Sequence, residues 1–212
     1  MCGRLASTLT WTDVADYYRL LFTKPLNLQV RLNIAPTEDV LVVLRGRDKH
    51  CNIGRHAGMM RWGLVPHWAG EMPKAATFNA RAEGIGDKPM WRDPLRHRRC
   101  VVTASSFYEW TGEKGARVPM NISRADGEPL SLAGLWDRNL ALGTLSCTVI
   151  VTTANDQMQP IHDRMPVILE ADAIDRWLEA PDEALLAPSA APLRIEPASP
   201  ALNRPGTLPD NP

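Results

Sequence analysis

The feature that most constrains the fold of this chain is a succession of short β-rich runs separated by turn residues. Branched aliphatic and aromatic residues gather in these runs, and Gly, Pro or Asp residues lie between them. Such runs are typical of β-strands. The dipeptide Asp126-Gly127 lies between two of the runs and predicts a hairpin turn. We predict strands at Val40–Leu44, Met59–Leu64, Cys100–Thr103, Phe107–Thr111, Val118–Ile122, Leu130–Trp136, Cys147–Thr153 and Pro166–Leu169.

Helical periodicity is confined to a few segments. Residues 12–22 read as a helix with Thr12 as its N-cap, because apolar residues recur there at helical spacing. A second helix is predicted at Ala171–Glu179 and a shorter one near Asp182–Ala187. Many short strands with few helices predict an α+β protein with a single domain. Its core is a mixed, strongly curved, barrel-like sheet with peripheral helices.

The C-terminal part of the chain has a different composition. The last 32 residues hold 8 of the 18 prolines, and apolar periodicity is almost absent after Pro197. Apart from a strand predicted at Leu193–Glu196, this pattern is typical of extended or disordered chain. We therefore expect one domain over residues 1–197 and a Pro-rich extended or disordered tail over residues 198–212.

Composition excludes several classes of protein. The 24 basic and 24 acidic side chains cancel, so bulk charge does not indicate a polyanionic partner. The four cysteines are about fifty residues apart and form no C-x-x-C pair, while the His50-Cys51 and His56 group has incomplete ligand spacing. We expect no metal and no cofactor. Without a signal peptide or a membrane-length apolar stretch, we expect a cytoplasmic protein with reduced thiols.

Cys2, which follows the initiator methionine, has unusual chemical potential. Methionine aminopeptidases remove Met1 when the next side chain is small, which would leave an α-amine and a thiol on one residue. The amine, with a pKa near ~7.7–8.0, is partly unprotonated at neutral pH, and the thiol is a second nucleophile. The alternative interpretation is a mobile chain terminus without a role.

Three further segments carry groups suited to catalysis. Asn79 and Arg81 alternate along an extended segment and could hold a phosphate, or Arg81 could simply pair with Glu83 at the surface. Glu109 lies in an aromatic strand, where burial would suit a general acid or base, or it could face solvent on an edge strand. His162 could shuttle protons, or it could be structural.

Aromatic and basic residues are interleaved in a way that suits single-stranded nucleic acid. Bases can stack on the rings while cations follow the phosphates. The chain has seven tryptophans, and five Lys or Arg residues lie between Lys88 and Arg99. The alternative is a set of core tryptophans beside a solvated basic helix. The candidate surface aromatics and their basic neighbour are Trp62, Trp68, Trp91, Trp110 and Arg92.

With these segments in view, the chain resembles the SOS response-associated peptidase (SRAP) family, whose members protect abasic sites in single-stranded DNA. The matching motifs occur in the family's order over residues 1 to about 170. Two departures are Ser106, where the family usually has glycine, and the poorly matching tail after about Leu193. The motifs are Met1-Cys2-Gly3-Arg4, Asn33-Ile34-Ala35-Pro36-Thr37, residues 62–68, Asn79-Ala80-Arg81-Ala82-Glu83, residues 99–102, Phe107-Tyr108-Glu109-Trp110 and residues 162–166.

The resemblance implies an SRAP-like domain over residues 1–197 and a role for each motif. Cys2 would be the nucleophile, with Asn79, Glu109 and His162 in the same pocket. Arg4 and Arg81 would hold phosphates, and Pro36, Met90, Trp91 and Trp110 would lie against bases. The amine of Cys2 would form a Schiff base with the aldehyde of an abasic site, and its thiol would close a thiazolidine ring. If closure fails, β-elimination gives a weak lyase activity.

Two other functions remain open from the residues alone. One is an N-terminal-nucleophile hydrolase or autoprotease that uses Cys2. The other is a non-covalent single-strand binding module. For the favoured function we expect a monomer that acts on abasic single strands or their junctions with duplex DNA. It would be cytoplasmic and nucleoid-associated when bound to DNA.

Overall fold

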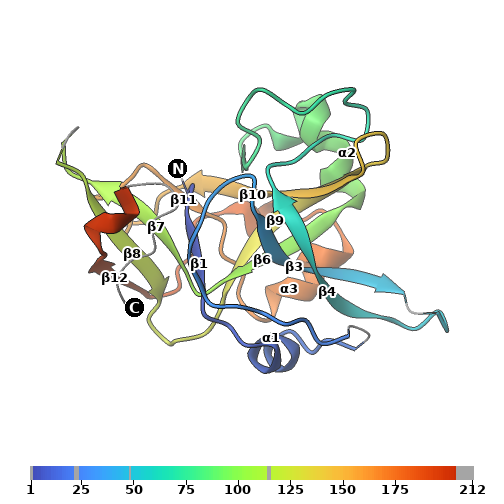
Figure 1. Cartoon of the computed structure of the whole chain (residues 1–212), viewed down its shortest axis with the longest axis horizontal. Helices are drawn as coiled ribbons and strands as arrows, with labels where there is room; N and C mark the ends of the chain where they lie inside the picture. The colour runs from blue at the N-terminus through green and yellow to red at the C-terminus, as the bar shows by residue number, and fades with distance from the viewer. Residues whose placement is uncertain (1, 22–23, 48, 114–115, 204–212) are drawn as a thin grey trace.

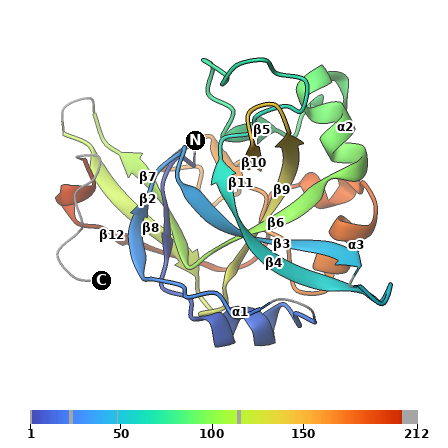
Figure 2. The same ribbon diagram turned by 45° about the vertical axis from the view of Figure 1, so that its right-hand side comes forward.

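A computed structural model describes residues 2–21, 24–47, 49–113 and 116–203 of the 212-residue chain. Its centre is a closed ring of strands, visible in Figures 1 and 2, in which β9 and β10 pair with each other and close the circle. Most neighbours are antiparallel, but β10 runs parallel to β4, so the sheet is mixed. In ring order the strands are β10 (Thr144–Thr153), β4 (Ile53–Trp62), β3 (Asp39–Arg47), β6 (Arg99–Ala104) and β9 (Leu130–Asn139).

Two short strands extend the ring beside the second half of β10. β5 (Asn79–Arg81) pairs with it in parallel and β11 (Arg164–Pro166) pairs with it antiparallel. A second sheet packs against this end of the ring (Figure 1). Its order is β12 (Leu193–Pro197), β8 (Val118–Arg124), β7 (Ser106–Thr111), β1 (Leu5–Ser7) and β2 (Arg31–Ile34). The expected α+β single domain with a mixed, barrel-like core is thus confirmed.

Alternation along the ring strands divides the apolar residues into two cores. Val42, Trp62 and Leu132 belong to one buried cluster inside the ring. Val43, the residue after Val42, belongs to a second cluster on the outer face. Leu135, three residues after Leu132, belongs to the same second cluster. Successive side chains of a strand point to opposite faces of the sheet. A ring strand with a buried cluster on each side must therefore carry apolar residues on both of its faces. This explains why its strands read as nearly continuous apolar runs.

Helices cover the outer face of the ring (Figure 2). α3 (Ala173–Glu179) inserts Trp177, which is fully buried and donates its indole N–H to the Cys100 carbonyl at 2.9 Å. α2 (Pro89–His97) begins with a proline at its first turn, where the missing N–H leaves no bond unmade. Within the part of the chain that the structure describes, no helix has the length and apolar character needed to cross a membrane.

The first helix differs from its predicted boundaries. α1 spans Trp11–Tyr17, shorter than the predicted 12–22, and its N-cap is Thr10. The Thr10 hydroxyl accepts the Asp13 backbone N–H at 3.2 Å, and Asp13 Oδ2 accepts the Thr10 N–H at 2.8 Å. This reciprocal capping box outcompetes Thr12, which has no comparable acidic partner three residues later.

The predicted hairpin at Asp126-Gly127 is wrong. Gly127 has the positive φ of 81° that a tight turn needs, so the turn itself is present. However, β8 before it belongs to the second sheet and β9 after it belongs to the ring, so the turn carries the chain between sheets. The remaining predicted strands are present with shifted ends. The run Pro166–Leu169 is the least accurate, since β11 is Arg164–Pro166 and Ile168 makes only an isolated bridge to Leu132.

The C-terminal segment is more ordered than predicted up to Asn203. β12 confirms the strand expected at Leu193–Glu196, and the short helix predicted near Asp182–Ala187 is a 3-10 helix at Glu183–Leu186. Residues 198–203 do not form an extended tail, because Pro200–Asn203 is a further 3-10 turn that buries Leu202. Residues 204–212 of the predicted tail lie outside the described residues.

Candidate functional site

Cys2 lies just before β1 and is completely buried in the core cluster of the ring. The Asn79 side chain donates from Nδ2 to the Cys2 carbonyl oxygen at 2.7 Å. Burial raises the pKa of the Cys2 thiol well above its ordinary range, and the negative charge of Glu109 raises it further. The positive charge of the chain N-terminus and, to a smaller extent, the Arg4 backbone N–H oppose this rise in the pKa. The thiol is therefore neutral at physiological pH in this arrangement.

Glu109 is placed beside Cys2 by the pairing of β7 with β1. Leu5 lies opposite Phe107, and the Tyr108 N–H donates to the Arg4 carbonyl at 3.0 Å. Continuing this antiparallel register brings Gly3 opposite Glu109. The Glu109 side chain is only 4% exposed. The alternative of a solvent-facing carboxylate on an edge strand is therefore wrong.

Asn79 comes from β5, which pairs with β10 through Val149. One side of its amide is used by the hydrogen bond to Cys2. Its Oδ1 atom is buried and, within the described residues, accepts no hydrogen bond. A buried acceptor without a donor is costly unless a ligand supplies one. Asn79 thus presents a free acceptor next to the backbone of Cys2.

His162 precedes β11, on the opposite side of β10 from β5. Its Nδ1 atom lies 2.9 Å from the Arg164 backbone N–H and 2.8 Å from Asp163 Oδ1. These two contacts require different tautomers, because the first needs Nδ1 as acceptor and the second as donor. We favour the backbone bond, since the Asp163 side chain is 78% exposed and can turn away. When Nδ1 accepts the Arg164 N–H, the proton of a neutral imidazole ring lies on Nε2.

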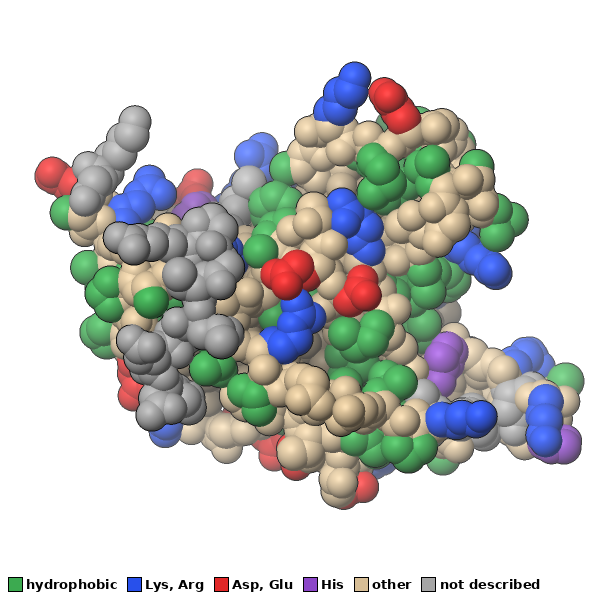
Figure 3. All heavy atoms as spheres, viewed as in Figure 1, with side chains coloured by type: hydrophobic (Ala, Val, Ile, Leu, Met, Phe, Trp, Pro, Cys, Tyr) green, Lys and Arg blue, Asp and Glu red, His purple; other side chains and the backbone are tan. Residues whose placement is uncertain are grey.

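Arginines and loop residues surround this cluster. The half-buried Arg4 donates to Asn33 Oδ1 at 2.5 Å, and Arg81 is exposed at the end of β5. Pro36 is half-buried in the loop after β2, where Thr37 has a positive φ of 82°. Lys or Arg side chains and Asp or Glu side chains are mixed with apolar ones on the face seen in Figure 3, so this face is not uniformly basic.

The candidate base-contacting residues differ in how far their side chains are exposed to solvent. Trp68 is 60% exposed and Arg92 is exposed, whereas Met90 is half-buried. Trp110 is also half-buried, and its indole N–H donates to Asn203 Oδ1 at 2.7 Å. The ring of Trp68 is therefore available for stacking without any rearrangement.

Two of the tryptophans require a correction. Trp62 is completely buried inside the ring, where its N–H donates to the Phe78 carbonyl at 2.9 Å. Trp91, a residue of α2, is 7% exposed and packs into the outer core. Stacking of a base on either ring would require opening the core. For these two residues the alternative interpretation, core tryptophans beside a basic helix, is correct.

Several supporting contacts were not foreseen. Glu83 pairs with Arg164 Nη1 at 2.5 Å, rather than with Arg81, and so ties the end of β5 to β11. Asn33 holds Arg4. Ser106, at the position of the family's glycine, is buried and hydrogen-bonds the Tyr108 phenol, which opposes the rise in the pKa of Tyr108 that burial causes. Ser106 and Tyr108 lie on the face of β7 opposite to Glu109, so this departure leaves Glu109 untouched.

Comparison with known proteins gives a consistent result. The family description "SOS response associated peptidase (SRAP)" matches residues 1–205. The abasic site processing proteins YoaM and YoqW of Bacillus subtilis are 35% and 34% identical over 184 residues, with 84% of this chain covered and 79% and 80% of theirs. A crystal structure of a Bacteroides thetaiotaomicron protein superposes with a TM-score of 0.79 at 22% identity, covering 96% of this chain and 95% of that one.

Proposed function

Because the chain belongs to the SOS response-associated peptidase family, we propose that it captures abasic sites in single-stranded DNA covalently through Cys2. The observation that carries this proposal is the buried Cys2, with Asn79 on its carbonyl and with the Glu109 carboxylate near enough for its charge to raise the pKa of the thiol. Met1 must first be removed, since only a free α-amine beside the thiol provides both nucleophiles.

The proposed reaction is a condensation with no net oxidation or reduction. The Cys2 amine adds to the aldehyde carbon of the ring-opened sugar, and the carbinolamine loses water to give a Schiff base. The Cys2 sulfur then bonds to the imine carbon, while the thiol proton passes to the nitrogen. One aldehyde and one aminothiol become a thiazolidine and water. Failure of the last step leaves a Schiff base that can undergo β-elimination, which accounts for a weak lyase activity.

The electrostatics of the site support attack by the amine before the thiol. Burial and the Glu109 charge keep the thiol protonated, so it is a poor nucleophile until its proton is removed. Glu109 would accept that proton and return it to the nitrogen. The same neutral thiol disfavours a hydrolase in which Cys2 attacks an amide as a standing thiolate.

Asn79 and His162 would assist at the sugar. The Asn79 Oδ1 atom accepts no hydrogen bond within the described residues, so it can orient a hydroxyl or the protonated nitrogen of the intermediate. With its proton on Nε2, His162 can donate to the sugar oxygen as the furanose opens. Asn79 lies on β5 and His162 lies just before β11, at either side of β10, which suits contacts from opposite sides of one substrate.

DNA would be held by residues around the cluster. Arg4 and Arg81 would bind phosphates, and Trp68, Trp110, Pro36 and Met90 would contact bases, with Arg92 adding charge. Both Arg81 and Trp68 are exposed, as such contacts need. We expect binding as a monomer to single strands or junctions, in the cytoplasm and on the nucleoid, and a steep weakening of affinity with salt.

A crosslinking assay tests this function. Purified protein incubated with an abasic single-stranded oligonucleotide should give a heat-stable species on a denaturing gel. Cys2→Ala should abolish it, Cys2→Ser should retain at most a labile Schiff base, and Cys51→Ala should match the wild type because Cys51 is exposed and outside the site. An equal stable adduct with Cys2→Ala, or an intact mass that retains Met1 in active protein, would contradict the proposal.

A further inference from the structure

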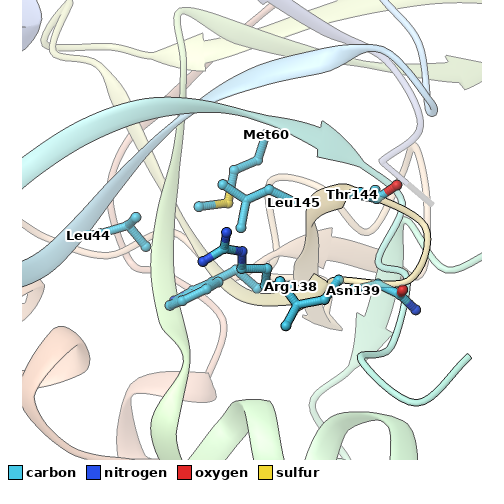
Figure 4. A pocket seen from close by; sticks show the side chains of 9 residues that line it. Leu44, Met60, Arg138, Asn139, Thr144 and Leu145 are labelled. Atoms are coloured by element: carbon cyan, nitrogen blue, oxygen red, sulfur yellow. The ribbon is translucent and has the colours of Figure 1, made fainter.

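A cavity of about 570 Å³, shown in Figure 4, lies beside the start of β10. β10 begins at this cavity with Thr144 and Leu145 and reaches Asn79 of the reactive cluster through Val149. Four residues of extended strand separate Leu145 from Val149, about 13 Å. The cavity is lined by Leu44, Met60, Trp136, Arg138, Asn139, Leu140, Gly143, Thr144 and Leu145.

The wall of this cavity is largely apolar and continues onto an apolar rim. Leu44 and Trp136 pack against the inner core, and Met60 is buried in it. Leu140, from the turn between β9 and β10, is 74% exposed, and Leu145, at the start of β10, is 39% exposed. Aliphatic side chains exposed beside an apolar cavity are typical of a surface that another molecule covers.

Two of the polar side chains at this cavity are already occupied. Asn139 donates to the Pro66 and Ala69 carbonyls at 2.8 Å each and accepts the Leu142 N–H at 2.9 Å. Thr144 donates its hydroxyl to the Leu142 carbonyl at 3.0 Å. Both side chains hold the turn and the preceding loop in place. They therefore contribute little to ligand recognition.

Arg138 is different. Its backbone is engaged, but within the described ranges its guanidinium forms neither an ion pair nor a hydrogen bond. Figure 4 shows the guanidinium beneath Met60 and Leu145, with its nitrogen atoms directed toward Leu44. A guanidinium over an apolar wall binds a carboxylate in a bidentate manner and is more weakly hydrated than an ammonium group.

We propose that this cavity docks an acidic segment of a protein partner, with a bulky apolar side chain inside it and a carboxylate on Arg138. A single free cation matches one carboxylate, whereas a nucleotide phosphate chain would need further donors that Asn139 and Thr144 cannot supply. The exposed Leu140 extends the apolar contact beyond the cavity, as a protein interface requires. An arginine beside aromatic and aliphatic anchors is the composition typical of interface hot spots.

The probe for this site is a fluorescein-labelled peptide, capped at both ends, of sequence Gly-Asp-Glu-Leu-Phe-Asp-Gly. In fluorescence anisotropy it should bind the wild-type protein saturably. Arg138→Gln and Leu145→Asp should each weaken binding about tenfold or more. Arg194→Gln, which alters an exposed arginine on β12, should leave binding unchanged. Peptides with Asn and Gln in place of the acids, or Ser in place of Leu and Phe, should bind weakly.

Three results would overturn the proposal. They are no saturable binding by the wild type, equal affinity of Arg138→Gln, or displacement of the peptide by thymidine monophosphate at comparable concentration. The DNA reaction provides an independent control. Arg138→Gln should form the abasic-site adduct normally, and Cys2→Ala should bind the peptide normally. Thermal melts of each variant would show that a loss of binding is not a loss of folding.

Discussion

Replacing Glu109 with glutamine separates two opposing effects at the reactive cysteine. Glutamine preserves the size of the side chain in a site that is 4% exposed, so packing should change little. The substitution removes the negative charge that helps to raise the pKa of the Cys2 thiol, and this alone would favour the thiolate. It also removes the proposed proton acceptor, which alone would slow the reaction.

Loss of the proton acceptor should outweigh loss of the negative charge in Glu109→Gln. Burial is the largest cause of the raised thiol pKa and remains in the variant, so the thiol stays mostly protonated. Loss of a general acid or base typically costs about 10²- to 10⁴-fold in rate. Each unit by which the thiol pKa falls can return at most about tenfold in thiolate. We therefore expect Glu109→Gln to be slower by about 10- to 10³-fold.

Single-turnover crosslinking to an abasic oligonucleotide measures this rate on denaturing gels. If ring closure is the slowed step, borohydride should trap a larger fraction of Schiff base in Glu109→Gln than in the wild type. Glu196→Gln, at an exposed position of β12, is the matched control and should behave as wild type. An unchanged time course with an unchanged trapped fraction would refute the role assigned to Glu109.

Other substitutions test the placement of the aromatic and basic residues. Trp62→Ala should lower the free energy of unfolding by about 3–5 kcal/mol in chemical denaturation, because it empties a fully buried site. Trp68→Ala should leave stability unchanged but weaken binding of single-stranded DNA by about 1–3 kcal/mol, measured by anisotropy. Arg81→Gln should reduce the slope of log affinity against log salt by about 0.7, as expected for one single-strand phosphate contact. Trp177→Phe should lower unfolding free energy by about 1–3 kcal/mol, since it leaves the Cys100 carbonyl without its donor. Equal stability of Trp62→Ala and wild type, or equal DNA affinity after the Trp68 or Arg81 change, would contradict these placements.

Local sequence patterns predicted correctly the features that depend on the residues of a single segment. The apolar runs located nearly every ring strand, because both faces of those strands are buried. The aromatic neighbours of Glu109 left a buried and a solvent-facing carboxylate equally open, and the structure buries the residue. Short strands such as β1 and β2 were missed, since three or four residues carry too little periodicity to stand out.

Pairing between distant segments could not be predicted in the same way. The turn at Asp126-Gly127 has the residues of a hairpin, yet the strands on either side of it join different sheets. Glu83 could have paired with Arg81 nearby, but β11 brings Arg164 closer. Trp62 and Trp68 occur in one short motif, and only the closure of the ring decides that the first is in the core and the second in solvent.

The sequence by itself determined the positions of most strands and the chemical groups of the proposed reactive centre. A cysteine at position 2 carries its potential aminothiol chemistry wherever it lies, because both groups belong to one residue. Only the tertiary structure decided the state of that thiol, since its raised pKa depends on burial in the ring and on the charge of Glu109, 107 residues away in the chain. The tertiary structure likewise left Arg138 over an apolar cavity. Periodicity reports which face of a strand is apolar, but the element that covers that face is set by contacts between segments far apart in the sequence.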